Sequence, residues 1–164
     1  MAFNDVKIYT VGALGVVPTT RWQTEANATA ILAGEPVKLK VAGSPYVLPL
    51  ADNEPTTSTT QVIGIAASNS TQTATADGYV EVYTCAPEIT WACKATTPAN
   101  IDTLSELNAL IGDRVLFDFG SSTYTVDENA GDAAINGIQI VGGDYVRGVI
   151  YFKFRPFAGE GAIA

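Results

Sequence analysis

The stretch Tyr79-Val80-Glu81-Val82-Tyr83 decides the fold class of this 164-residue chain. Its residues alternate, so Val80 and Val82 would share one face while Tyr79, Glu81 and Tyr83 share the other. This pattern is typical of a β-strand with one buried face. Asp77-Gly78, immediately before it, is a strong turn signal. The sequence therefore predicts a strand that begins at a tight turn.

Similar patterns recur outward from this stretch in both directions. We expect further strands over residues 36–41, 46–50, 61–67, 89–95, 114–119, 123–126, 135–141 and 145–154, the last being the longest. Gly64 lies inside one of them and indicates a bulge or a close approach of two backbones. Gly142-Gly143-Asp144 is expected to turn the chain. Many short strands predict a mainly β chain that forms a small β-barrel or sandwich.

One short α-helix is expected at about residues 103–111. Thr103-Leu104-Ser105-Glu106 fits a capping box, in which the threonine hydroxyl accepts from the third helical amide and the glutamate reaches back. Gly112 stands where a left-handed C-terminal residue is favoured. The apolar residues at helical spacing are Leu104, Leu107, Leu110 and Ile111. A helix this short is unstable alone, so we expect it to pack on the sheet.

The first 29 residues differ from the rest and predict an extended N-terminal arm. Residues 30–156 would form a single β-rich domain, and residues 157–164 a flexible tail. Apolar side chains without a core-forming period need a partner surface. The arm residues expected at such contacts are Phe3, Ile8, Tyr9, Val11, Val16, Val17 and Trp22. The alternative is that this segment supplies a first strand of the domain and a loop, since residues 7–11 alternate.

The composition excludes several classes of partner. Charged residues make up only 16% of the chain, so we expect hydroxyl groups and bound partners to cover much of the surface. Nine basic residues against 17 acidic ones give a net charge of −8, which argues against binding to nucleic acid or to an anionic membrane. The chain has no 18-residue apolar run and no pattern of a signal peptide, so neither is expected.

The residue types needed for common catalytic and metal sites are missing or badly spaced. The chain has no histidine, which removes Ser-His-Asp and Cys-His catalysis. Cys85 and Cys93 do not have metal or redox spacing; they are expected to be small buried residues, with a disulfide across a hairpin as the alternative. The segment Asp127–Asp132 lacks the ligand order of a calcium loop and is expected to be a solvated turn. We expect no enzyme activity, no cofactor and no metal.

Aromatic residues leave a carbohydrate-binding or adhesion module open as an alternative. The side chains that could stack on sugars are Trp22, Tyr79, Tyr83, Trp91 and Tyr151. Aromatic residues on half-buried strands more often pack in the core or across strands.

Three stretches in a fixed order resemble a known family. They are Ile31-Leu32-Ala33-Gly34-Glu35-Pro36-Val37, then Val62-Ile63-Gly64-Ile65-Ala66, then the segment from Ala74 to Val82. Their order and spacing resemble the capsid decoration, or head cement, proteins of tailed bacteriophages, over roughly residues 30–84. The helix at 104–111 followed by Arg114-Val115-Leu116-Phe117 is similar to larger members of that group.

The resemblance implies a viral structural protein on the outer surface of an icosahedral phage head, made in the host cytoplasm. Its partner would be the major capsid protein, and it would be a homo-oligomer, with a trimer expected. It would stabilise the head against the pressure of packaged DNA, because a ligand of the assembled shell favours that state. A tail or tube component of a phage remains the alternative within the structural class.

Overall fold

Two antiparallel sheets and one α-helix make up the described chain. The computed structural model describes residues 6–12 and 15–156. The strands are β1 (Val6–Thr10), β2 (Thr19–Thr24), β3 (Pro36–Leu39), β4 (Val47–Pro49), β5 (Val62–Ala66), β6 (Gly78–Thr84), β7 (Thr90–Lys94), β8 (Arg114–Gly120), β9 (Thr123–Asp127), β10 (Ile138–Asp144) and β11 (Val149–Phe154). A short 3₁₀ helix, η2 (Pro98–Ile101), precedes α1 (Leu104–Leu110). The prediction of a mainly β chain with one short helix is confirmed.

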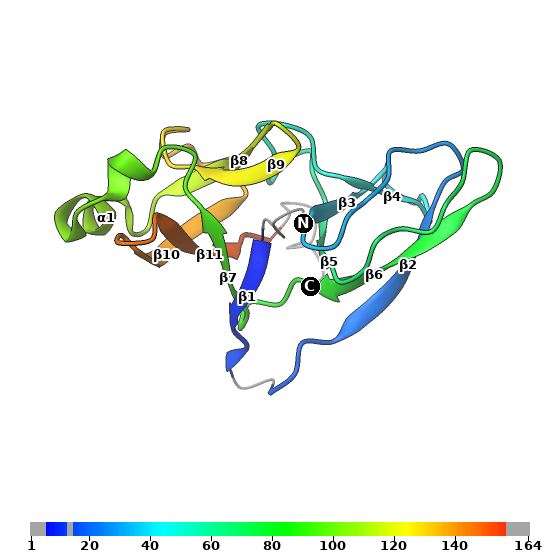
Figure 1. The fold of residues 1–164 in the computed structure, drawn as a ribbon, viewed down its shortest axis with the longest axis horizontal. Coiled ribbons are helices and arrows are strands. Elements are labelled where there is room, and N and C mark those ends of the chain that lie inside the picture. The colour runs from blue at the N-terminus through cyan, green and yellow to red at the C-terminus, as the bar shows by residue number, and fades with distance from the viewer. Residues whose placement is uncertain (1–5, 13–14, 157–164) are drawn as a thin grey trace.

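The two sheets lie beside each other in a sandwich-like arrangement rather than a closed barrel (Figure 1). The six-stranded sheet has the order β1-β7-β11-β10-β8-β9, and the five-stranded sheet has the order β2-β6-β5-β3-β4. Each sheet curls. A parallel bridge joins Ala95, just after β7, to Val126 of β9, and another joins Gln23 of β2 to Tyr46, just before β4. Curling brings distant strands of one sheet around a common core.

Each sheet surrounds buried apolar side chains. The larger core lies within the six-stranded sheet and includes Trp91, Phe117, Tyr124, Ile138, Ile140, Ile150 and Phe152, together with Leu50 and Ile65 from the other sheet's side. The smaller core consists of Ile31, Val37, Val47, Ala66, Val80 and Val82. Val80 and Val82 are fully buried and Tyr79 is exposed, as the alternation around residue 80 predicts.

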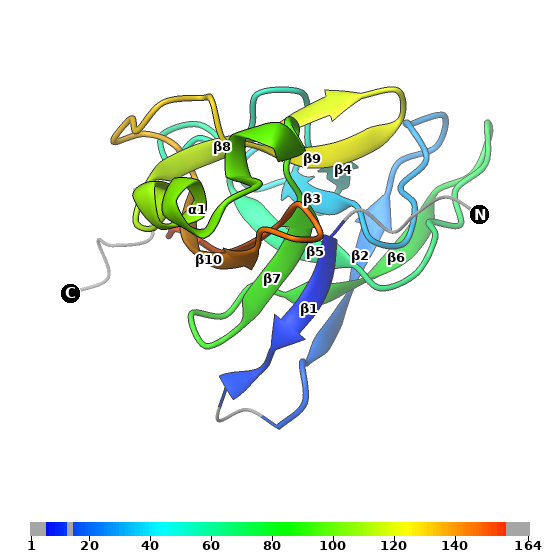
Figure 2. The ribbon, with the colours of Figure 1, turned by 60° about the vertical axis from the view of Figure 1, so that its left-hand side comes forward.

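The segment expected as an extended arm supplies one edge strand to each sheet. β1 pairs with β7, and β2 pairs with β6 over six positions from Thr19 to Thr24. The described parts of the β1–β2 connection, residues 11–12 and 15–18, lie at the lower extreme of the molecule (Figures 1 and 2). The described arm residues thus extend both sheets and project from them at one end.

The helix begins as predicted, but its apolar face is only partly buried. Thr103 accepts from the amide of Glu106 and the carboxylate of Glu106 accepts from the amide of Thr103, so both halves of the capping box are present. Leu107 is buried over the end of β10, where α1 lies across the sheet (Figure 2). Leu104 and Ile111 are 56% and 49% exposed. The prediction that the helix packs on the sheet is therefore confirmed, with Leu107 and Leu110 as the residues that make the contact.

The last hairpin turns later than the sequence predicts. β10 covers Ile138–Asp144 and continues through the two glycines that were expected to turn. The turn is formed by residues 145–148 instead, and it is closed by the Arg147 amide, which donates to the carbonyl of Asp144. β11 has six residues and is shorter than β10, so the prediction that it is the longest strand is wrong. It is an inner strand of the six-stranded sheet.

Candidate interaction surface

The structure separates the predicted contact residues into packed and exposed ones. Phe3 lies outside the described residues. Ile8 and Val17 pack against the larger core, Trp22 packs against the smaller core, and Val11 is half-buried. Only Tyr9, 52% exposed, and Val16, 77% exposed, present most of their side chains to solvent. Tyr9 lies on β1 and Val16 lies within the projecting β1–β2 connection.

Tyr9 belongs to a cluster on the outward face of the six-stranded sheet. Its ring stacks on that of Tyr151, with centroids 3.7 Å apart and planes 13° apart. Burial raises the pKa of Tyr151, and a hydrogen bond with Tyr9 raises it further. We call this surface the basic face and define it by Lys7, Tyr9, Lys94, Arg147, Tyr151 and Lys153.

Strand register explains why these side chains meet. Lys7 is paired with Ala92, Ala92 with Tyr151, and Tyr151 with Gly142. Paired residues of antiparallel strands share a face, so this row crosses four strands on one side of the sheet. The small neighbours on both sides of Tyr151 leave room for its ring to meet that of Tyr9. Lys153 and Lys94 follow on the same face by the two-residue period of their strands.

A second charged surface covers the outward side of β8 and β9. We call it the acidic face and define it by Asp52, Asp118 and Asp127. Partial burial raises the pKa of Asp118, and the carboxylates of Asp52 and Asp127 raise it further. Asp52 is fixed in place because its Oδ1 accepts from the amide of Phe119 at 2.9 Å. Like charges are thus held close together on this side.

The repulsion around Asp118 predicts a stabilising substitution. A carboxyl whose pKa is raised by folding costs stability when ionised, and that cost disappears once it is protonated. We expect Asp118→Asn to raise the free energy of unfolding at about pH 7, with the difference shrinking as pH falls through the pKa of Asp118 to about pH 3. Urea denaturation of both proteins at the two pH values measures this. Equal stability at the higher pH would contradict it.

A groove of about 470 Å³ lies where the two sheets meet. Its lining includes Trp22 of β2, Val62 and Ile63 of β5, and Phe154 at the end of β11. Arg155 is the charged side chain among the described lining residues, and its guanidinium donates to the carbonyls of Ala134 and Asn136 at 2.7 Å each. The uncharged polar residues of the lining are Thr20, Thr60, Gln61 and Thr84, so the groove is of mixed character.

The acidic segment 127–132 is more ordered than a solvated turn. Glu128 is buried, and its carboxylate accepts from the amides of Thr96 and Thr97 and from the side chain of Asn100. Asp132 pairs with Arg114, whose guanidinium lowers the pKa of Asp132 to about 2. The prediction of a solvated turn is wrong for Glu128, because this carboxylate anchors the segment after β7.

The described residues form no metal cluster, disulfide or membrane-spanning helix. Within residues 6–12 and 15–156, no three His, Cys, Asp or Glu side chains are grouped as a metal site requires. Cys85 and Cys93 are not joined by a disulfide, and Cys93 is buried with its thiol donating to the carbonyl of Tyr124. None of the described helices has the length and apolar character needed to cross a membrane.

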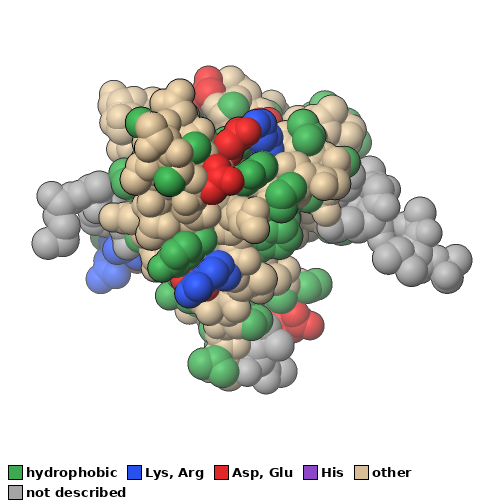
Figure 3. Space-filling view, turned by 90° about the vertical axis from the view of Figure 1, so that its right-hand side faces the viewer, with side chains coloured by type: hydrophobic (Ala, Val, Ile, Leu, Met, Phe, Trp, Pro, Cys, Tyr) green, Lys and Arg blue, Asp and Glu red, His purple; other side chains and the backbone are tan. Residues whose placement is uncertain are grey.

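Neutral side chains dominate the end of the molecule formed by the five-stranded sheet. In the space-filling view of that side, apolar side chains are scattered among polar uncharged groups, and acidic and basic side chains are few (Figure 3). The guanidinium of Arg21 lies over the exposed ring of Tyr79, 4.2 Å from the ring centroid. Arg21 in turn donates to Glu81 at 2.7 Å.

Comparison with known proteins gives no assignment. No protein-family model, no curated protein and no solved structure matches the chain.

Sequence reasoning found Tyr9 but missed the basic face around it. Residues on β1, β7 and β11 are brought together by pairing of strands that lie far apart in the chain. The alternation within residues 149–153 already places Tyr151 and Lys153 on one side of a strand. The sequence contains no local signal that Lys7 and Tyr9 pack beside them.

Proposed function

We propose that this chain is a capsid decoration protein that binds the outer surface of an icosahedral phage head and stabilises it against internal DNA pressure. Its partner would be the major capsid protein, and it would act in the virion as a homo-oligomer, with a trimer expected. The observation that carries the proposal is the exposure of two apolar side chains of the arm, Tyr9 on β1 and Val16 in the projecting β1–β2 connection. Apolar side chains exposed on a projecting segment are available for a protein contact.

Two further features support this proposal. Charged residues make up only 16% of the chain, which suits a protein partly covered by neighbours. The order of motifs across residues 30–84 resembles that of head cement proteins. Among the described residues the groove between the sheets lacks converging ionisable groups, so it offers less support for an enzyme.

The carbohydrate-binding alternative receives less support from the five aromatic candidates. Trp91 is buried, Tyr151 stacks on Tyr9, and Tyr79 is covered by Arg21. A sugar platform needs an open ring face.

The tail or tube alternative predicts the same kind of apolar contact, and electron microscopy of labelled virions separates it from attachment to the shell.

Binding to capsids stripped of this chain tests the proposal. We expect Val16→Asp to weaken binding about tenfold or more, because the contact would have to bury a charge in place of an apolar side chain. The matched control is Val41→Asp, which changes a 61% exposed valine in the β3–β4 turn and should bind as the unaltered chain does. Co-sedimentation with capsids measures both. Unchanged binding by a folded Val16→Asp variant would show that the projecting β1–β2 connection does not contact the capsid.

A further inference from the structure

The end of the molecule that carries α1 leaves several large apolar side chains exposed. They are Leu104 and Ile111 at the two ends of the helix, and Tyr145 and Val146 in the turn between β10 and β11. Val146 is 79% exposed, slightly more than Val16. We call this surface the helix end and define it by these four side chains. Large apolar groups exposed near one another are characteristic of an interaction surface.

Two close approaches hold the helix and the turn side by side. A Cβ on Gly143, just before the turn, would lie 2.9 Å from Cδ1 of Leu107, so β10 runs directly against the helix. A Cβ on Gly148, at the end of the turn, would lie 2.8 Å from Cβ of Pro98, so the turn rests on η2, which leads into α1. Both ribbon views show β10 beside α1 (Figures 1 and 2). The exposed side chains of both elements therefore lie at one end of the molecule.

Carboxylates outnumber cations around the helix end. The carboxylates are those of Asp102, Glu106, Asp113 and Asp144, and residues 95–113 contain no lysine or arginine. The cations are Arg147 in the turn and, at the margin, Lys94 of β7, whose strand partner is Val149. Four carboxylates against two cations leave a formal charge of −2. Arg114, which follows Asp113, does not change this sum because it is paired with Asp132.

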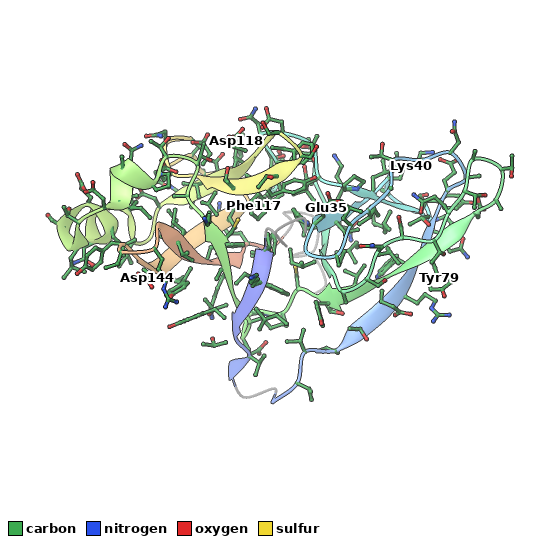
Figure 4. The ribbon with its side chains drawn as sticks, in the orientation of Figure 1. Glu35, Lys40, Tyr79, Phe117, Asp118 and Asp144 are labelled. Carbon is green, nitrogen blue, oxygen red and sulfur yellow. The ribbon has the colours of Figure 1, made fainter. Side chains whose placement is uncertain are left out.

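Two of these carboxylates lie close together beside an exposed apolar side chain. A hydrogen bond with Glu106 raises the pKa of Asp102, and the negative charge of Glu106 raises it further. Leu104 lies between these two residues in the sequence, in the first turn of α1. A cation placed there would offset the repulsion between the carboxylates. Figure 4 shows Asp144 at this same end of the ribbon, with Lys40 and Tyr79 at the opposite end.

We propose that the helix end binds a basic amphipathic segment of another protein. The apolar side chains of the segment would cover Leu104, Ile111 and Val146, and its lysine or arginine side chains would lie against the surrounding carboxylates. An apolar centre with a polar rim and complementary charge is typical of protein interfaces. A second copy of this chain fits less well, because a two-fold contact places the same carboxylates of both copies opposite each other.

The inference goes beyond the proposed function because it concerns a separate surface. The proposed capsid contact uses the β1–β2 connection at the lower extreme of the molecule, whereas α1 lies at one side (Figure 1). A peptide assay that contains no capsid therefore tests the helix end independently of the proposed function.

Binding of a designed peptide tests the chemistry of the partner. The probe is a fluorescein-labelled peptide of leucine and lysine in amphipathic helical order, about two heptads long. By fluorescence anisotropy at about 0.05 M NaCl, we expect saturable binding with a Kd of about 10 μM. The affinity should fall about fivefold or more at about 0.5 M NaCl, because salt screens exposed charges. A matched peptide of leucine and glutamate should bind at least about tenfold more weakly. No saturable binding, or equal binding of both peptides, would overturn the proposal.

Substitutions identify the surface that binds the peptide. We expect Leu104→Ser/Val146→Ser to weaken binding about tenfold or more by removing apolar contacts, with Val41→Ser on the β3–β4 turn as the control that binds normally. Asp102→Asn/Asp113→Asn should weaken binding about fivefold. Its matched control is Asp52→Asn/Asp118→Asn, which removes two carboxylates from the acidic face and should leave binding nearly unchanged. Circular dichroism and thermal melts verify folding, and Val146→Ser alone serves if the double variant does not fold.

The controls decide between the helix end and its alternatives. An equal loss of affinity in the two carboxylate variants would mean that net charge alone attracts the peptide, and this would overturn the proposal. Full binding by a folded Leu104→Ser/Val146→Ser variant would also overturn it. Sedimentation velocity of the chain without peptide tests the remaining occupant. A dimer that Leu104→Ser/Val146→Ser abolishes would place a second copy on the helix end, whereas a helix end that stays free until the peptide is added supports the proposal.

Discussion

Phe117→Ala is expected to lower the free energy of unfolding by about 3–5 kcal/mol, which is among the largest effects of any single truncation in this chain. Phe117 is fully buried, and its ring makes edge-on contacts with those of Tyr124 and Phe152 at 6.1 and 5.4 Å. Removing it leaves a cavity at the centre of the larger core, which the surrounding strands cannot fill because they are tied by their hydrogen bonds.

Phe119→Ala is the matched control for this prediction. Phe119 lies two residues further along β8 on the same face, but it is 37% exposed. We expect a loss of about 1 kcal/mol, since solvent fills the space left by a side chain at the surface. Urea unfolding of both variants gives the comparison. Equal losses would mean that the larger core is not centred on Phe117.

Gly64→Ala is the second substitution with a large expected effect, a loss of about 3 kcal/mol or more. A Cβ on Gly64 would lie 1.8 Å from the carbonyl oxygen of Tyr83, so β5 and β6 would have to move apart. The same position lies beside the register shift between β5 and β3. The two nearest atoms belong to the backbone of Tyr83 and cannot rotate away, so the strain is not easily relieved.

Gly120→Ala provides the control at another strand glycine. A Cβ there meets no atom within 4 Å, and the position does not have a left-handed backbone. We expect a change of about 0.5 kcal/mol or less. Thermal melts of the two proteins should differ clearly, and a Gly64→Ala variant as stable as Gly120→Ala would contradict the close approach of β5 to β6.

Local sequence signals predicted those features whose causes are local. The helix begins where Thr103 and Glu106 can bond each other's amides, and both residues belong to the same four-residue segment. Gly64 inside an apolar strand predicted a close backbone approach, which the contact with Tyr83 confirms. The alternation around Val80 predicted a strand with one buried face, because burial follows from side-chain parity alone.

Features that depend on distant segments were missed. Gly142 and Gly143 resemble a turn, yet both lie within β10, where a Cβ on Gly143 would lie 2.5 Å from the carbonyl oxygen of Val149 and 2.9 Å from Leu107, so a glycine is needed at position 143. Glu128 is a charged residue of a type that is usually exposed. Its burial is explained by the amides of Thr96 and Thr97, which donate to its carboxylate from a distant part of the chain. The faces of the six-stranded sheet likewise arise from pairing between the two ends of the chain.

The two parallel bridges at Ala95–Val126 and Gln23–Tyr46 have a consequence for how copies of this chain coexist at high concentration. A bridge at the margin of a sheet occupies backbone amides and carbonyls that another polypeptide would otherwise use to add a strand. Growth of fibres by repeated strand addition needs a long stretch of such unoccupied groups. Each bridge interrupts this row at one position, Val126 of β9 and Gln23 of β2, so neither of these two margins offers an unbroken strand edge for amyloid-like growth.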